Sequence, residues 1–123
     1  MRIAFTVLNS NGSELDERFG RAEYFAIYDT DTKDTEIIDN DAKNESGGAG
    51  GKAVKILFQN KVQAVVSGEF GPKAVIALKD FEIKAYRKGN SKTISEALYK
   101  FGENSLEEID ESTVKSHNGL YKV

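Results

Sequence analysis

Residues 50–68 read GGKAVKILFQNKVQAVVSG, and this stretch decides the fold class. Its first part repeats apolar residues at helical spacing, which predicts an amphipathic helix over residues 50–60. Its last part, residues 63–67, is a short apolar run that is typical of a buried strand. A helix that leads directly into a buried strand indicates a crossover unit, and crossover units build parallel sheets.

The segments before this unit predict three strands. Residues 2–7 (RIAFTV) are mostly apolar, which predicts a central strand covered on both faces. Residues 22–30 and 35–39 also favour strands, and the short polar turn between them predicts a hairpin. The polar loop over residues 8–20 is longer than a simple connection needs, which is typical of a functional loop.

The segments after the unit predict two more helices and one more strand. Gly71 and a proline open a helix over residues 72–79, because a proline at the first helical position loses no hydrogen bond. Residues 82–87 alternate in polarity, as a strand at a sheet edge does. A capping box opens a helix over residues 93–101, and the chain from residue 103 onward reads as a polar tail.

This order of elements predicts an α/β fold with three layers, α/β/α. A meander followed by right-handed crossovers gives a five-stranded mixed sheet in the order 3-2-1-4-5, with strand 2 antiparallel to its neighbours. That arrangement is ribonuclease-H-like. We expect one domain over residues 1–102 and a polar, flexible tail over residues 103–123. Residues 2–7 contain no carboxylate for two Mg²⁺ ions, so the nuclease chemistry of that fold is not expected.

Composition excludes several kinds of function. The 123 residues contain no cysteine and one histidine, His117, so we expect neither a disulfide nor a metal site made only of protein ligands. The net charge of −3 comes from 20 acidic and 17 basic residues that are evenly mixed, so nucleic acid is not an expected partner. No membrane span or signal-peptide core is visible, and the cytoplasm is the expected compartment.

Glycines mark two predicted helix entrances beside the long loop. A helix N-terminus presents unpaired N–H groups, and glycine lets a ligand approach them closely. Both entrances are expected beyond the carboxyl ends of parallel strands, where α/β proteins bind ligands. The alternative interpretation of the first cluster is a flexible linker, or glycines that only satisfy positive φ angles. The glycines concerned are Gly47, Gly48, Gly50 and Gly51 at the first entrance, and Gly68 and Gly71 at the second.

Basic residues near these entrances predict an anionic ligand. Arg18 and Arg21 end the long loop, and Lys52 and Lys73 each follow a glycine entrance. Guanidinium groups suit carboxylates or phosphates. The alternative is that the two arginines pair on the surface with neighbouring acids, namely Asp16, Glu17 or Glu23.

Two other classes of function remain open at this level. A hydrolase or transferase would use Ser67 as nucleophile with a metal on Asp16 or Glu69, although no base is expected beside Ser67. A protein-interaction module would act through the polar tail. No residue is predicted to be catalytic, and the leading prediction is a binding domain for a small anion.

Several motifs in the same order resemble those of the dinitrogenase iron–molybdenum cofactor biosynthesis family. They are N-x-N-G-x-x-L-D-x-R-F-G-R-A-x-Y-F over residues 9–25, S-G-G-A-G over residues 46–50 and A-V-V-S-G-x-x-G-P-K-A over residues 64–74. The resemblance covers about residues 1–102. It implies a small stand-alone carrier with a ribonuclease-H-like fold, and cofactor-assembly proteins as partners.

The resemblance also implies a ligand and a surface. The ligand would be an iron–sulfur or iron–molybdenum cluster. Carriers of this group are expected to supply Cys or His to the cluster, whereas this chain has only His117, outside the matched motifs. The cluster is therefore expected to be held by outer-sphere hydrogen bonds. The family's glycine-lined surface would comprise Arg18, Phe19, Gly20, Gly47, Gly48, Gly50, Ser67, Gly68 and Gly71, beside Arg21.

Overall fold

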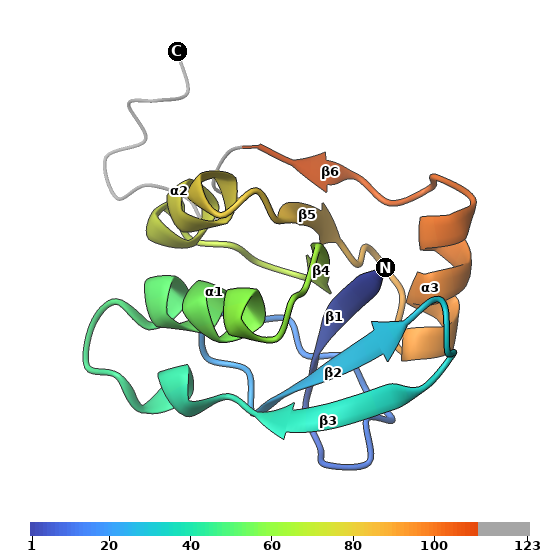
Figure 1. Ribbon diagram of the computed structural model, residues 1–123, viewed down its shortest axis with the longest axis horizontal. Coiled ribbons are helices and arrows are strands. Elements are labelled where there is room, and N and C mark those ends of the chain that lie inside the picture. The colour runs from blue at the N-terminus through green and yellow to red at the C-terminus, as the bar shows by residue number, and fades with distance from the viewer. Residues whose placement is uncertain (111–123) are drawn as a thin grey trace.

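One mixed sheet organises residues 1–110, the part of the chain that this computed structural model describes (Figure 1). The strands are β1 (Arg2–Val7), β2 (Tyr24–Asp29), β3 (Thr35–Asp39), β4 (Ala64–Ser67), β5 (Lys84–Arg87) and β6 (Glu108–Ile109). They run in the order β3-β2-β1-β4-β5-β6. β1 is antiparallel to β2 and parallel to β4, and β4 is parallel to β5.

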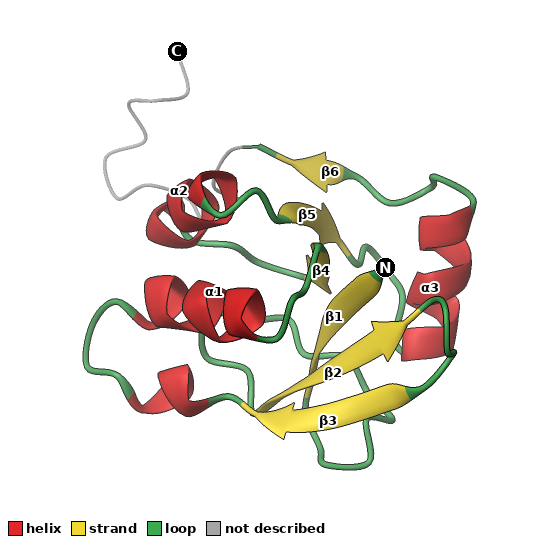
Figure 2. Ribbon diagram, in the orientation of Figure 1, coloured by secondary structure: helices red, strands yellow, loops and turns green. Residues whose placement is uncertain are grey.

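Helices cover both faces of this sheet (Figures 1 and 2). α1 (Ala49–Gln59) and α2 (Pro72–Asp80) lie side by side on one face, and α3 (Ile94–Gly102) lies on the other. A short 3-10 helix, η1 (Asp41–Asn44), joins β3 to the segment before α1. No helix among the described residues is long and apolar enough to cross a membrane.

The sheet separates two apolar cores, because successive side chains of a strand point to opposite faces. In β1, Ala4 belongs to the core under α1 and α2, whereas Ile3, Phe5 and Val7 belong to the core under α3. The first core also contains Ala53, Val54 and Leu57 of α1 and Ala74, Val75 and Leu78 of α2, all of them buried.

These observations confirm the predicted α/β three-layer fold, the strand order and the antiparallel second strand. The sheet differs from the prediction by a sixth strand, β6, which lies within the segment predicted as tail and pairs antiparallel with β5. β5 is therefore not the edge strand. A two-residue strand is too short for its periodicity to be recognised, but Leu106 and Ile109 pack against the two cores. His117 lies outside the described residues.

Candidate functional site

The N-terminus of α1 has unpaired backbone donors. Gly48 caps the helix with a φ of 74° and supplies no side-chain hydrogen bond. The first intrahelical donor is Lys52, whose N–H donates to the Gly48 carbonyl over 3.1 Å. Within residues 1–110, the N–H groups of the three residues between them, 49–51, have no acceptor. They therefore carry the positive end of the helix dipole.

The N-terminus of α2 is built in the same way. Gly71 is the cap and again has no side chain for capping, while Pro72 at the first position has no N–H to satisfy. Val75 N–H donates to the Gly71 carbonyl over 3.1 Å. The N–H groups of Lys73 and Ala74 have no acceptor in the described part of the chain.

Close backbone packing brings the two helix entrances together. A β-carbon at Gly50 would lie 2.9 Å from the Ala74 Cβ and 3.3 Å from the Ala74 nitrogen. A β-carbon at Gly20 would lie 3.0 Å from the Gly50 nitrogen. Gly50 therefore admits the first turn of α2, and Gly20 admits the first turn of α1. The protein's own backbone, rather than a ligand, explains these two glycines.

A shallow depression of about 340 Å³ lies at this junction, and we call it the α1–α2 depression. No acidic residue lines it. Lys73 lines the depression and has no ion-pair partner among residues 1–110, whereas the Lys52 ammonium contacts the Glu45 carboxylate at 2.9 Å. The depression is lined by Gly20, Arg21, Gly48, Ala49, Gly50, Gly71, Pro72, Lys73 and Ala74.

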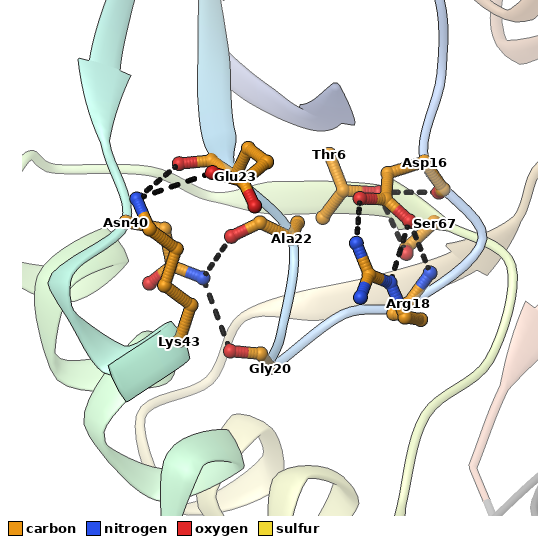
Figure 3. Close-up of polar contacts among 9 residues, drawn as sticks. All are labelled: Thr6, Asp16, Arg18, Gly20, Ala22, Glu23, Asn40, Lys43 and Ser67. Atoms are coloured by element: carbon orange, nitrogen blue, oxygen red, sulfur yellow. Dashed lines mark hydrogen bonds and ion pairs between the residues drawn. The ribbon is translucent and has the colours of Figure 1, made fainter. Parts of the chain in front are cut away.

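Two side chains hold the wall beside α1. Arg21 Nη1 donates to the carbonyls of Lys43 (2.8 Å) and Glu45 (2.6 Å), so it fastens the segment before α1. Asn40 is buried, and its Nδ2 donates to the carbonyls of Gly20 (3.1 Å) and Ala22 (2.9 Å), as Figure 3 shows. Asn40 Oδ1 in turn accepts from the N–H of a residue in η1. The sequence analysis missed Asn40, because a single asparagine after a strand is a common turn signal.

Arg18 does not lie at the depression, although the sequence predicted that it would hold an anionic ligand. Its Nε and Nη2 donate to Asp16 Oδ1 (3.1 Å) and Oδ2 (2.9 Å), the surface pairing considered as the alternative (Figure 3). Asp16 is only 2% exposed. The hydrogen bond to Asp16, and then its negative charge, raise the pKa of Arg18. Arg18 neutralises a buried carboxylate and does not line the α1–α2 depression.

Phe19 and Ser67 are core residues in the structure. Phe19 is 1% exposed and stacks on Phe70 with 5.3 Å between ring centroids, so its side chain is not open to a ligand. Ser67 is also 1% exposed, and its Oγ lies 2.7 Å from Thr6 Oγ1. Thr6 has one proton, which it donates to the Asp16 carbonyl at 2.8 Å, so Ser67 must donate its own proton to Thr6.

This geometry does not favour the enzyme alternative. The Ser67 hydroxyl is buried and its proton is held by another hydroxyl, not by a base. Asp16, the metal ligand proposed with it, is buried and already accepts three hydrogen bonds from Arg18. Within residues 1–110, no group of three or more His, Cys, Asp or Glu side chains could hold a metal ion.

The remaining predicted glycines divide between two places. Gly47 lies next to the depression but does not line it, and no atom stands within 4 Å of where its side chain would be. Gly68 lines a different hollow. A β-carbon at Gly68 would collide with the carboxylate of Glu17 and lie 2.6 Å from its carbonyl. The structure thus gathers Gly20, Arg21, Gly48, Gly50 and Gly71 around the depression and leaves Gly47 beside it. Arg18, Phe19, Ser67 and Gly68 do not line it.

Comparison with known proteins relates the chain to a family of nitrogenase cofactor proteins. The family model described as dinitrogenase iron-molybdenum cofactor matches residues 1–104. An uncharacterized protein of Methanocaldococcus jannaschii is 33% identical over 113 residues, which are 89% of this chain and 92% of that protein.

Two solved structures are similar over nearly the whole chain. The apo form of the orange protein from Desulfovibrio gigas has a TM-score of 0.87 and 30% identity, covering 92% of this chain and 96% of that one. A NifB-like protein from Thermotoga has a TM-score of 0.80 and 33% identity, covering 94% of this chain and 98% of that one.

Proposed function

Since this chain belongs to the dinitrogenase iron-molybdenum cofactor family, we propose that it is a non-catalytic carrier of an anionic metallocluster, which it holds in the α1–α2 depression. The cluster is cargo, and an iron–sulfur or iron–molybdenum species is the proposed class. The cytoplasm is the proposed compartment, and proteins of cofactor assembly are the proposed partners.

The observation that carries this proposal is the convergence of two uncapped helix N-termini in a depression without acidic residues. The unpaired N–H groups of residues 49–51 and 73–74 and the Lys73 ammonium are all hydrogen-bond donors, and all favour negative charge. A dianionic or trianionic cargo gains from each of them at once. A neutral cargo would not.

The donor set also defines the chemistry of binding. Amides and ammonium groups donate protons and do not ligate iron or molybdenum, so the cargo must bring its own inorganic ligands. Sulfide or oxide atoms on the surface of a cluster accept hydrogen bonds from such donors, and hydrogen bonds of this outer-sphere kind tune metal centres. The absence of cysteine fits this mode, because no thiolate is available to displace the cargo's own ligands.

The relatives support the same class of function. One of them is described as the apo form of an orange protein, and another as NifB-like. An apo form implies that a bound group can be removed, and unmodified amino-acid side chains absorb no visible light. Transferred to this chain, these descriptions favour a carrier with a detachable coloured cargo.

Anaerobic incubation with isolated iron–molybdenum cofactor, and separately with a thiolate-ligated [4Fe–4S] cluster, tests the proposal. We expect visible absorbance to co-elute with the protein in gel filtration. Lys73→Gln should weaken binding by about tenfold, because one charge-assisted hydrogen bond is lost. Lys79→Gln is the matched control, because Lys79 lies on the same helix away from its N-terminus. Colourless protein with both clusters would refute the carrier function, and equal loss in both variants would refute the site.

A further inference from the structure

A second hollow lies at the carboxyl ends of β4 and β5, and we call it the β4–β5 depression. Its volume is about 340 Å³, at the small end of the range for ligand pockets. In α/β sheets, ligands bind beyond the carboxyl ends of parallel strands, which is where this hollow lies. It is lined by Glu17, Gly68, Arg87, Lys88, Gly89, Asn90, Lys100, Ser105, Leu106 and Glu107. It shares no lining residue with the α1–α2 depression.

Arg87 lines this hollow, and most of its guanidinium N–H groups have no acceptor among residues 1–110. Its Nη2 lies 3.4 Å from Glu69 Oε2, a long contact that uses one of the five guanidinium donors. No other acceptor within the described residues contacts the guanidinium group. The position of Arg87 is firm, because its backbone N–H donates to the Glu107 carbonyl over 2.9 Å and because it ends β5.

Lys100, from α3, is a second cationic residue that lines the hollow. Its Nζ donates to Asn90 Oδ1 over 2.6 Å and has no carboxylate partner among residues 1–110. Two of its three ammonium protons remain for a ligand. Arg87 from the sheet and Lys100 from α3 therefore present free donors to one hollow.

The third cation, Lys88, shapes the hollow instead of binding. Its Nζ contacts Glu17 Oε1 (3.0 Å) and the carbonyls of Gly89 and Ser91 (each 3.4 Å). These contacts neutralise Glu17 and hold the turn after β5, in which Gly89 has a φ of 59°. Among residues 1–110, the charged groups at the hollow without an ion-pair partner are Lys100 and Glu107, and Arg87 has only its long contact with Glu69.

From this arrangement we infer that the β4–β5 depression binds a small organic oxyanion, a carboxylate or a phosphate ester, with its anionic group on Arg87 and Lys100. A planar guanidinium fork matches two oxygens of either group. The carboxylate of Glu107, which also lines the hollow, disfavours a second negative charge on the ligand. This site is independent of the proposed carrier function.

Titration of the ¹⁵N-labelled full chain, at constant ionic strength, tests the inference. The probes are inorganic phosphate, glycerol phosphate and succinate, and the readout is the chemical shift of the Gly68, Gly89 and Asn90 amides. We expect at least one probe to give saturable shifts with a Kd below about 5 mM. Stronger binding of the two phosphates than of succinate identifies the ligand as a phosphate ester. Stronger binding of succinate identifies it as a carboxylate.

Variants decide whether Arg87 and Lys100 are responsible. Arg87→Gln and Lys100→Gln should each raise the Kd by about tenfold. Arg87→Lys keeps the positive charge but loses the two parallel N–H donors of the guanidinium group, so it should also weaken binding. Lys84→Gln, on the same strand outside the hollow, and Lys73→Gln, in the other depression, should bind as the parent does. Lack of saturation with all three probes, or unchanged binding by both Arg87 variants, would overturn the inference.

Discussion

The absence of a β-carbon at Gly50 lets the N-termini of α1 and α2 approach each other closely. A methyl group there would meet the Ala74 Cβ at 2.9 Å and push α2 away from α1. We predict that Gly50→Ala lowers the free energy of unfolding by about 1–3 kcal/mol, because the overpacked contact outweighs the better helix propensity. Urea unfolding followed by circular dichroism measures the change.

Gly51 is the matched control for this prediction. It lies one residue further along α1, and no atom stands within 4 Å of where its side chain would be. Gly51→Ala should raise the free energy of unfolding by about 0.5–1 kcal/mol through helix propensity alone. If both variants were stabilised, the close approach of α1 and α2 would not require a glycine.

Asn40 stabilises the wall of the α1–α2 depression through three hydrogen bonds. Its replacement by alanine leaves the carbonyls of Gly20 and Ala22 without the Asn40 donor in a buried place. We predict that Asn40→Ala lowers the free energy of unfolding by about 2 kcal/mol. Asn44→Ala, at an exposed position of η1, should change it by less than about 0.5 kcal/mol. Equal effects of the two variants would contradict this role.

At the scale of elements, α3 combines its N-cap with a titratable group. Thr93 Oγ1 accepts from the Glu96 N–H over 3.2 Å, and Glu96 Oε1 accepts from the Lys92 N–H over 2.7 Å. The second hydrogen bond is the main cause that lowers the pKa of Glu96 below its ordinary value of 4.5. The contribution of Glu96 to stability is therefore complete above that value and is lost as the pH falls through the lowered pKa.

This linkage predicts a pH effect of Glu96→Gln. The glutamine oxygen still accepts from the Lys92 N–H but does not ionise, so the loss of stability on acidification from about pH 5 to about pH 3 should be smaller than in the parent. Thermal unfolding across this range measures the slope. Ser95→Ala, in the same turn, should keep the slope of the parent. An unchanged slope in Glu96→Gln would mean that the capping carboxylate is equally solvated in both states.

The same capping box explains why α3 was predictable from the sequence. Its signal is local, as is that of Pro72 at the start of α2 and of the apolar spacing in α1. β6 gave no such signal, because its two residues depend on contact with β5, more than twenty positions earlier in the chain. Elements that carry their own periodicity and caps are predictable, and elements defined by a distant partner are not.

The candidate site was predictable to the same extent. The glycines at 48, 50 and 71 belong to helix entrances, which are local features, and the fold brings them together as expected. Arg18 was assigned to the site as a basic residue at the end of the long loop, and the family resemblance added Ser67 and again Arg18. Their side chains have partners inside the protein instead: Arg18 pairs with the buried carboxylate of Asp16, two residues earlier, and Ser67 bonds to Thr6, 61 residues away.

At the scale of the whole molecule, the boundary predicted at residue 102 can be tested against the sheet. A chain that ends at Gly102 lacks β6, which leaves the edge of β5 unpaired and removes the packing of Leu106 and Ile109. Relative to a chain that ends at Asp110, we predict a loss on the order of 2 kcal/mol in the free energy of unfolding and a tendency to self-associate. Chemical unfolding and sedimentation velocity measure the two effects, and identical behaviour would place the boundary at residue 102.

The uncapped start of α1 also supplies its own reporter. Amide protons that have no acceptor exchange rapidly with solvent deuterium, whereas those of the next turn are protected by the helix. Cargo seated on residues 49–51 would slow exchange at those positions while leaving the C-terminal turn of α1 unchanged. The exchange rates of these amides would thus report how much of the site is filled, residue by residue, even for a colourless anion. The helix itself is folded with or without the cargo.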